Sequence, residues 1–347
     1  MALMERTYSR KQCFRGRRLV YGQAAVYHVV SRTAFGRYSF EDEEKRMFLR
    51  MLGKQAGFCG VEVLAYCVMG NHFHLLVKLP EACAISDEEL LRRYRLLYDE
   101  ENCPPSSPSP KVLEGLLRED GEEGRELRER IVARMHDLAC FMRELKQRFG
   151  IWYNHRHGNR GTLWAERFRS TIVEESPEAL TTVAAYIDLN PVRAKLVDDP
   201  ADYRFSSYGR AAGGDQAARR SYELVFCRER SWRQLLPGYN LVLYGKGDRS
   251  KGSVGKDQGR IDPRKVARIL ESGGKVPMAE VLRLRVRYFT YGTALGSKTF
   301  LEELGARWKE RFGVERKQNV HSMRHGEWGG LRSYRNLQVE PVTVPLD

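Results

Sequence analysis

The chain has 347 residues, and its 42% hydrophobic and 30% charged content indicates a globular protein of one large domain or two ordinary ones. The formal net charge of +14 predicts a polyanionic partner, with nucleic acid ahead of an anionic membrane surface. The sequence has no apolar run of roughly 18 residues that could span a membrane, no apolar signal region near its start, and seven scattered cysteines. We therefore expect a cytoplasmic protein without a membrane partner.

The first part of the chain predicts the order β-α-β-β. Residues 24–32 have strand composition, and the stretch after them carries acidic residues and then apolar residues at helical spacing. Residues 61–69 and 72–79 are two more strands, and Gly70-Asn71 between them is typical of a tight turn. These two strands should form an antiparallel hairpin.

The next part predicts a helix, a strand and a second helix after an exposed insertion. Residues at about 80–127 are Pro/Ser-rich and charge-dense, apart from one short helix. A helix at about 127–149 and a strand at 170–175 follow, and then a helix over 177–190 opens with a serine and a proline. The sum is close to a ferredoxin-like α+β fold, an antiparallel sheet with helices on one face.

The remaining chain divides into two parts. Residues 213–259 are expected to form a linker, and residues 260–347 a mainly helical C-terminal extension. Helical patterns lie near 262–272, 277–289 and 297–312. Dimerisation, accessory DNA binding through a weak helix-turn-helix pattern, and core packing are all open roles for this extension.

Two histidines open the strand at 72–79. Side chains of a strand alternate between its faces, so His72 and His74 share one face, while Phe73, Leu75 and Val77 share the other. The apolar face can pack on a core. The other face presents two imidazoles side by side, an arrangement suited to binding a cation.

The helix over 177–190 carries a second pair of interest. Tyr186 and Asn190 lie one turn apart and project together. If they meet the histidine face, a divalent metal on His72, His74 and Asn190 would polarise a scissile phosphate, and Tyr186 would attack phosphorus. The products would be a 5′-phosphotyrosine and a free 3′-OH.

Asn190 is the ligand with the strongest rivals. An asparagine before a proline is often a helix cap, and Asp188 or a water molecule could take its place. His155 and His157 have the same spacing as the first pair but favour a DNA-facing basic loop. His321 and His325 have a helical spacing that favours a solvated helix face. Tyr203 and Tyr208 are rival tyrosines that favour ordinary packing.

Four blocks of sequence together resemble a known family: YHVVSR, YCVMGNHFHLLVK, GTLWAERFRS and YIDLNPVRAKLVDDPADYRFSSYG. They are similar, in order, to the single-tyrosine HUH transposases, and specifically to the REP-associated tyrosine transposases. The resemblance covers roughly residues 15–212, with an insertion longer than compact members carry. It implies that His72, His74 and Asn190 bind the metal and that Tyr186 is the nucleophile.

The same resemblance implies Mg²⁺ or Mn²⁺ as cofactor and single-stranded DNA with palindromic hairpins as partner. It also implies that the basic segment before the first strand reads bases that flank the hairpin. Phosphate contacts are expected from eight arginines: Arg15, Arg17, Arg18, Arg156, Arg160, Arg167, Arg169 and Arg193. Both a monomer and a homodimer are compatible with these features.

The sequence thus predicts a metal-dependent single-stranded DNA endonuclease and strand transferase. The alternative is a non-catalytic protein on the same fold that binds DNA by its structure. A rolling-circle initiator or plasmid relaxase is a further alternative, disfavoured because the chain has no GxxxxGK[ST] motif of a helicase.

Overall fold

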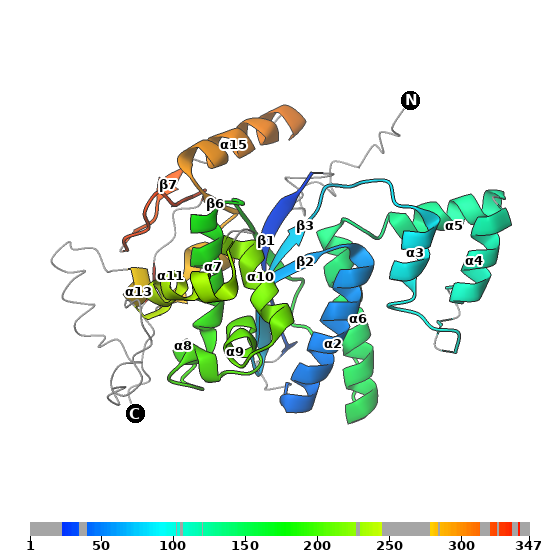
Figure 1. The fold of residues 1–347 in the computed structure, drawn as a ribbon, viewed down its shortest axis with the longest axis horizontal. Helices are drawn as coiled ribbons and strands as arrows, with labels where there is room; N and C mark the ends of the chain where they lie inside the picture. The colour runs from blue at the N-terminus through cyan, green and yellow to red at the C-terminus, as the bar shows by residue number, and fades with distance from the viewer. Residues whose placement is uncertain are drawn as a thin grey trace.

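The fold is an α+β arrangement built around one large sheet (Figure 1). The computed structural model describes residues 23–34, 40–101, 103–104, 107–119, 121–226, 230–244, 278–283, 285–312, 320–324, 326–334 and 339–340. Within these residues the strand order of the sheet is β2-β3-β1-β4-β6-β8-β7. The expected α+β class is confirmed.

Four antiparallel strands form one side of the sheet, with β2 at its edge. They are β1 (Ala25–Arg32), β2 (Glu62–Val68), β3 (His72–Leu79) and β4 (Arg169–Val173). β1 lies between β3 and β4, and β3 pairs with β2 through the expected hairpin. Because one helix connects β1 to β2 and others connect β3 to β4, this order is the ferredoxin-like one that the sequence predicts.

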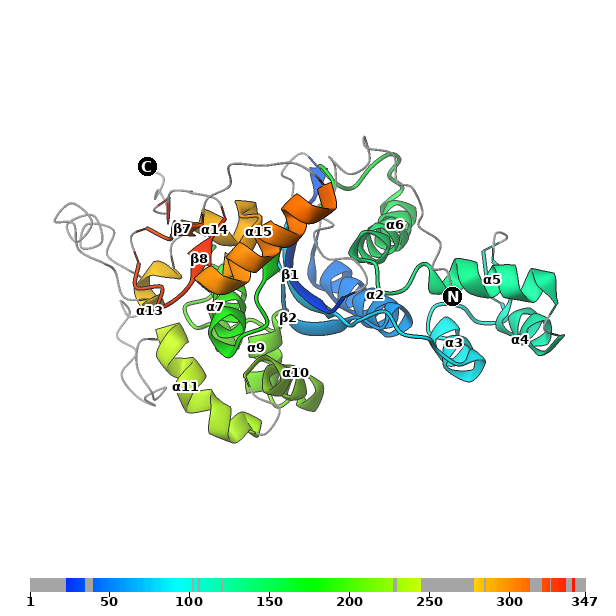
Figure 2. The same cartoon turned by 90° about the horizontal axis from the view of Figure 1, so that it is seen from above.

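Two long helices cover one face of the sheet, α2 (Asp42–Cys59) and α6 (Leu138–His157) (Figure 2). The ring of Phe48 on α2 lies 4.5 Å from that of Phe73 on β3 and 5.3 Å from that of Phe149 on α6. These contacts bury the apolar face of β3, as its alternation predicts. α6 runs from 138 rather than from about 127, and it ends eight residues later than expected.

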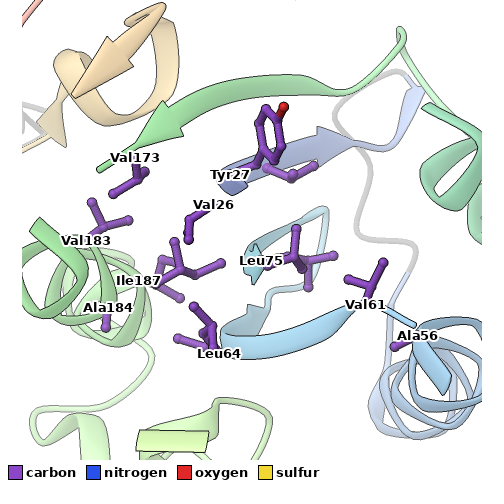
Figure 3. Close-up of a cluster of buried hydrophobic side chains, with 14 of the residues drawn as sticks. Val26, Tyr27, Ala56, Val61, Leu64, Leu75, Val173, Val183, Ala184 and Ile187 are labelled. Carbon is purple, nitrogen blue, oxygen red and sulfur yellow. The ribbon is translucent and has the colours of Figure 1, made fainter. Parts of the chain in front are cut away.

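The opposite face is covered by α7 (Pro177–Asp188). Figure 3 shows Val183 and Ile187 of this helix pointing toward Val26 of β1 and Val173 of β4, which pair across the two strands. All four side chains are buried. The expected single layer of helices therefore describes α2 and α6, and α7 adds a layer on the other side.

The insertion is helical rather than irregular. It contains α3 (Asp87–Tyr94), α4 (Pro110–Glu119) and α5 (Glu122–Val132), which lie together beyond α2 and α6 (Figures 1 and 2). Leu90, Leu113 and other apolar side chains of these helices are buried. The Pro/Ser-rich composition marks the connection between α3 and α4.

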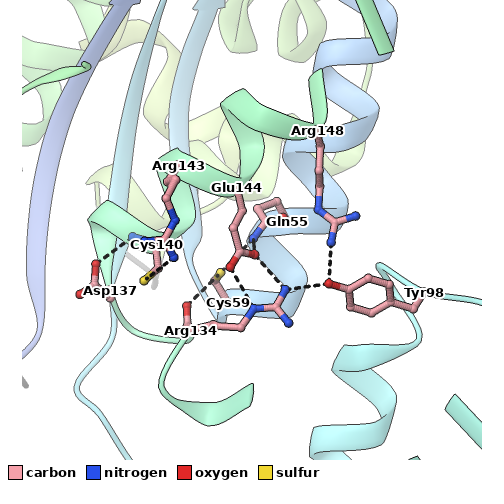
Figure 4. A network of polar contacts seen from close by, with 9 residues as sticks. All are labelled: Gln55, Cys59, Tyr98, Arg134, Asp137, Cys140, Arg143, Glu144 and Arg148. Carbon is pink, nitrogen blue, oxygen red and sulfur yellow. Dashed lines mark hydrogen bonds and ion pairs between the residues drawn. The ribbon is translucent and has the colours of Figure 1, made fainter. Parts of the chain in front are cut away.

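A polar network joins the insertion to α2 and α6 (Figure 4). Arg134 donates to both carboxylate oxygens of Glu144 at 2.9 Å and to the Tyr98 hydroxyl at 2.9 Å. Gln55 of α2 donates to the same Glu144 at 3.0 Å, and Arg148 donates to Tyr98. The network fixes the insertion against the two helices.

Residues 213–259 are not a linker over their described part. They contain α10 (Gln216–Phe226) and α11 (Trp232–Tyr244), which follow α8 (Asn190–Arg193) and α9 (Ser207–Ala212). α10 and α11 place Tyr222, Tyr239 and other aromatic side chains in the core. The Gly/Lys/Arg-rich composition that predicted a linker belongs to residues 245–259, which lie outside the described part of the chain.

The described C-terminal part joins the main sheet. β6 (Ala294–Gly296) pairs in parallel with β4, so that Ala294 lies opposite Ile172. The other elements are α13 (Met278–Val281), β5 (Arg285–Val286), α14 (Arg287–Tyr291), α15 (Lys298–Phe312), β7 (His321–Ser322), β8 (Arg332–Ser333) and β9 (Val339–Glu340). The helix expected at 297–312 is confirmed, the one at 277–289 is broken by β5, and the one at 262–272 lies outside the described residues.

Candidate active site

The two sequence-predicted histidines lie on the face of β3 that α7 covers. Their ring centroids are 5.2 Å apart, with the planes nearly perpendicular. His74 is only 2% exposed, whereas His72 at the strand end is partly exposed and its Nδ1 lies 2.6 Å from the Asn71 side-chain oxygen.

A third histidine, missed from the sequence, belongs to the same cluster. His28 of β1 is 1% exposed, and its Nε2 lies 2.9 Å from Nδ1 of His74. Its Nδ1 donates to the main-chain oxygen of Phe289 at 2.7 Å. A signal was present, because an ionisable residue stands among the valines of β1, but its partner Phe289 is 261 residues away.

The electrostatics of the cluster favour neutral imidazoles. Burial lowers the pKa of His28 to about 4, although the hydrogen bond to Phe289 raises it. Burial, and then the neighbouring His28 and His72, hold the pKa of His74 well below its usual value. A neutral ring keeps a nitrogen lone pair, which a metal requires.

α7 carries Tyr186 to this cluster. Ser176 caps the helix by accepting from the Ala179 amide, and Pro177 occupies its first turn, as the sequence predicts. The Tyr186 ring lies 6.0 Å from the rings of both His28 and His74. The structure therefore brings the predicted nucleophile to His74, one of the two predicted histidines, and to His28.

Two side chains cover Tyr186, which is 3% exposed. The ring of Phe289 on α14 lies 4.7 Å from its ring. The guanidinium of Arg193 lies 4.0 Å from the Tyr186 ring centroid and donates to the main-chain oxygens of Tyr186 and Leu282 at 2.6 Å each. Leu282 and Phe289 both come from the C-terminal part, for which the sequence assigned no role.

Asn190 is the first residue of α8, and its side-chain amide caps the last turn of α7 by bonding its carbonyls. It is buried, and its amide nitrogen donates to the Ile187 main-chain oxygen at 3.1 Å. The hydrogen bond uses the amide nitrogen of Asn190. The donor types of the proposed site, two imidazole nitrogens and one amide oxygen, suit a divalent cation. Among the residues that the structure describes, no group of three His, Cys, Asp or Glu side chains could hold a metal ion.

The carboxylate of Asp188 has other partners. It is fully buried and accepts from the hydroxyls of Tyr222 (2.5 Å) and Tyr239. Burial raises its pKa from 3.8 to about 7, and the two hydroxyls oppose that rise. Its contacts thus join α7 to α10 and α11.

The rival residues have packing roles. Tyr203 donates to the main-chain oxygen of Val68 at 2.8 Å, and Tyr208 is buried and bonded to Asn240. The expected loop around His155 and His157 is instead the last turn of α6, a correction that follows from Gly158, whose left-handed backbone ends the helix. His321 lies on β7, and His325 lies outside the described residues.

The eight predicted DNA-binding arginines are in different environments. Arg160 and Arg167 are exposed, whereas Arg156 pairs with Glu43 and Glu44 and Arg169 pairs with Glu166. Arg193 lies on the Tyr186 ring. Arg15, Arg17 and Arg18 lie outside the described residues.

Comparisons with known proteins find a family match for one segment near the start of the chain. Residues 23–88 match the sequence model of the family described as "Transposase IS200 like". One solved structure, described as "Structure of the REP associates tyrosine transposase bound to a REP hairpin", is similar at 16% identity and a TM-score of 0.36, over 62% of this chain and 87% of that chain. No curated protein matches. Within the described residues, no helix has both the length and the apolar character that crossing a membrane requires.

The matched segment holds β1, α2, β2 and β3, and with them His28, His72 and His74. Its match supports a transposase-like role in DNA processing. The resemblance to the IS200-like transposases found in the sequence is thereby confirmed over residues 23–88, the segment that carries the histidine cluster.

Proposed function

We propose that the protein is a metal-dependent endonuclease and strand transferase for single-stranded DNA that folds into palindromic hairpins. The observation that carries the proposal is the position of Tyr186, 6.0 Å from the His74 ring on the covered face of the sheet. A phenol beside His74, whose pKa burial holds well below its usual value, suits a tyrosine nucleophile next to a metal ligand.

His72 and His74 would hold Mg²⁺ or Mn²⁺ through ring nitrogens, with the amide oxygen of Asn190 as a further ligand. The bound ion supplies Lewis acidity at the scissile phosphate. Because Asn190 also caps α7, its position is fixed by the same helix that carries Tyr186.

The reaction itself is a transesterification. The Tyr186 phenolic oxygen attacks phosphorus, a bond from that oxygen to phosphorus forms, and the bond from phosphorus to O3′ breaks. The phenol loses its proton and the leaving oxygen gains one, giving a free 3′-OH and a 5′-phosphotyrosine. The ester keeps the bond energy, so a second 3′-OH can reverse the step without ATP.

Access to Tyr186 requires a side chain to move. Phe289 and Arg193 both lie against its ring, and the residue is 3% exposed. Binding of DNA therefore has to displace at least one of them. The same burial is the observation that favours the second candidate, a non-catalytic protein that binds hairpin DNA through exposed cations such as Arg160 and Arg167.

The test uses 5′- and 3′-labelled single-stranded hairpin oligonucleotides from repeats that flank the gene. Wild type and Tyr186→Phe are incubated with Mn²⁺ or Mg²⁺, and the products are resolved on a denaturing gel. We expect cleavage by the wild type, none by Tyr186→Phe, and none with EDTA. If both proteins bind the hairpin equally and neither cleaves it, the nuclease proposal is wrong and the protein is a non-catalytic DNA binder.

A further inference from the structure

The three buried groups Phe289, His28 and His74 form one continuous chain of hydrogen bonds. The Phe289 main-chain oxygen lies 2.7 Å from His28 Nδ1, and His28 Nε2 lies 2.9 Å from His74 Nδ1. The planes of the two imidazole rings are 17° apart, and their centroids are 5.2 Å apart. The N···O and N···N distances are those of good hydrogen bonds.

The direction of each bond follows from the first acceptor. A carbonyl oxygen can only accept, so His28 must carry its proton on Nδ1. In a neutral His28 ring, Nε2 is then an acceptor, and the proton in the second bond must belong to Nδ1 of His74. Both rings are almost fully buried, which disfavours an extra proton on either of them, and the guanidinium groups of Arg193 and Arg32 disfavour it further at His74.

The tautomer of His74 is thereby fixed. With its proton on Nδ1, the ring has its lone pair on Nε2, the atom that would face a metal. Metal-binding histidines commonly have such a hydrogen bond on the second nitrogen, which sets both the tautomer and the ring orientation. Here Nε2 of His28 would accept the hydrogen bond from Nδ1 of His74, the role that a carboxylate or carbonyl oxygen has in other metal sites.

Phe289 is itself held in place from the sheet. The Thr171 hydroxyl of β4 lies 3.1 Å from the Phe289 main-chain oxygen and 2.9 Å from the Gly292 main-chain oxygen, so its one proton is shared between these two acceptors. The Phe289 ring also packs on the Tyr186 ring at 4.7 Å. One residue of the C-terminal part therefore contacts both the nucleophile and the support of a metal ligand.

We infer that His28 and the main-chain oxygen of Phe289 are positioning groups that hold His74 in its metal-binding tautomer, so that the C-terminal part completes the active site. The inference rests on the proposed function in taking His74 as a ligand. It gives the C-terminal part a role inside the site rather than in a separate module.

The first experiment reads the tautomers directly. Long-range ¹H–¹⁵N NMR spectra of the metal-free, full-length wild type report which nitrogen of each histidine is protonated. We expect a protonated Nδ1 and an unprotonated Nε2 for both His28 and His74. A protonated Nε2 on His74 would overturn the inference.

The second experiment titrates Mn²⁺ into metal-free protein and measures bound ion by electron paramagnetic resonance. His28→Leu removes both hydrogen bonds and should weaken Mn²⁺ affinity about 10–100-fold. His28→Gln should keep affinity within a few-fold, because its amide nitrogen can donate to Phe289 while its oxygen accepts from His74. Equal Mn²⁺ affinity in His28→Leu and wild type would overturn the inference.

A third variant covers the case in which His28→Leu fails to fold. Thr171→Val loosens the Phe289 oxygen without touching a histidine, and should give a smaller loss of Mn²⁺ affinity; no change would count against the inference. The readouts separate the two proposals. Wild type that has the expected tautomers and a His28-dependent Mn²⁺ affinity but cleaves no hairpin supports the positioning role and contradicts the nuclease.

Discussion

The guanidinium of Arg193 lies 4.0 Å from the ring centroid of Tyr186 and donates to the main-chain oxygen of the same residue at 2.6 Å. A planar fork of donors can stack on a ring and bind two carbonyls at once, whereas an ammonium group cannot. Burial lowers the Arg193 pKa, and the group stays charged. Arg193 thus fixes the Tyr186 ring from one side while Phe289 packs against it from another.

Arg193→Lys should therefore misplace Tyr186. We expect hairpin cleavage to slow about 100-fold, because a displacement of roughly 1 Å in a reacting group has that effect. DNA affinity, measured by fluorescence anisotropy, should change far less. Arg118→Lys, at an exposed position of α4 away from the predicted DNA contacts, is the matched control and should cleave at the wild-type rate. Wild-type cleavage by Arg193→Lys would contradict the positioning role.

The buried carboxylate of Asp188 should make stability depend on pH. Its pKa of about 7 in the folded protein lies above the ordinary 3.8, so the folded state keeps a proton that the unfolded state releases. The contribution is fully present below about pH 4 and is lost as pH rises toward 7, by about 1.4 kcal/mol per pH unit within that window.

Asp188→Asn cannot ionise, and its oxygen can still accept from Tyr222 and Tyr239. Urea unfolding between about pH 4 and 7 should show a flatter pH dependence in this variant than in the wild type. Asp198→Asn, a change of the same type at an exposed position, should leave the pH dependence unaltered. Parallel curves for wild type and Asp188→Asn would show that the carboxyl is not the titrating group.

Asn190 has two roles in this account, and two substitutions separate them. Asn190→Asp removes the amide donor to Ile187 and should cost about 1 kcal/mol of stability, while it keeps an oxygen for Mn²⁺. Asn190→Ala should lose the hydrogen bond and also Mn²⁺ affinity. If both variants bind Mn²⁺ equally, Asn190 is a cap and not a ligand.

The network around Glu144 should matter for stability and not for chemistry. Glu144→Ala leaves Arg134 largely buried without its carboxylate and should lower the free energy of unfolding by about 2–4 kcal/mol. Arg92→Ala breaks an exposed pair with Glu89 and should cost less than about 1 kcal/mol. Similar losses in the two variants, measured by urea unfolding, would contradict this ranking.

The centre of the fold could be predicted because its signals are local. Alternation placed His72 and His74 on one face of β3, the turn at Gly70-Asn71 gave the hairpin, and Ser176 with Pro177 marked the start of α7. Each of these features depends on residues that are neighbours in the chain. The ferredoxin-like order followed from the same elements.

The rest depends on contacts across long sequence distances. β6 joins the sheet beside β4 although more than 100 residues separate them, and its three residues carry too little pattern to predict a strand. The predicted linker is wrong at α10 and α11. These helices are held in the core by Tyr222 and Tyr239, whose hydroxyls donate to the distant Asp188. His28 was passed over since its role depends on Phe289.

The assignment of Tyr186 as the nucleophile is tested most directly by mass spectrometry. Protein is incubated with a hairpin oligonucleotide and Mn²⁺, quenched and digested, and the peptide that carries a covalent nucleotide is sequenced. We expect a single modified residue, Tyr186, linked to the nucleotide through a 5′-phosphate. A nucleotide on Tyr203, Tyr208 or another residue, or cleaved DNA without any covalent adduct, would contradict it.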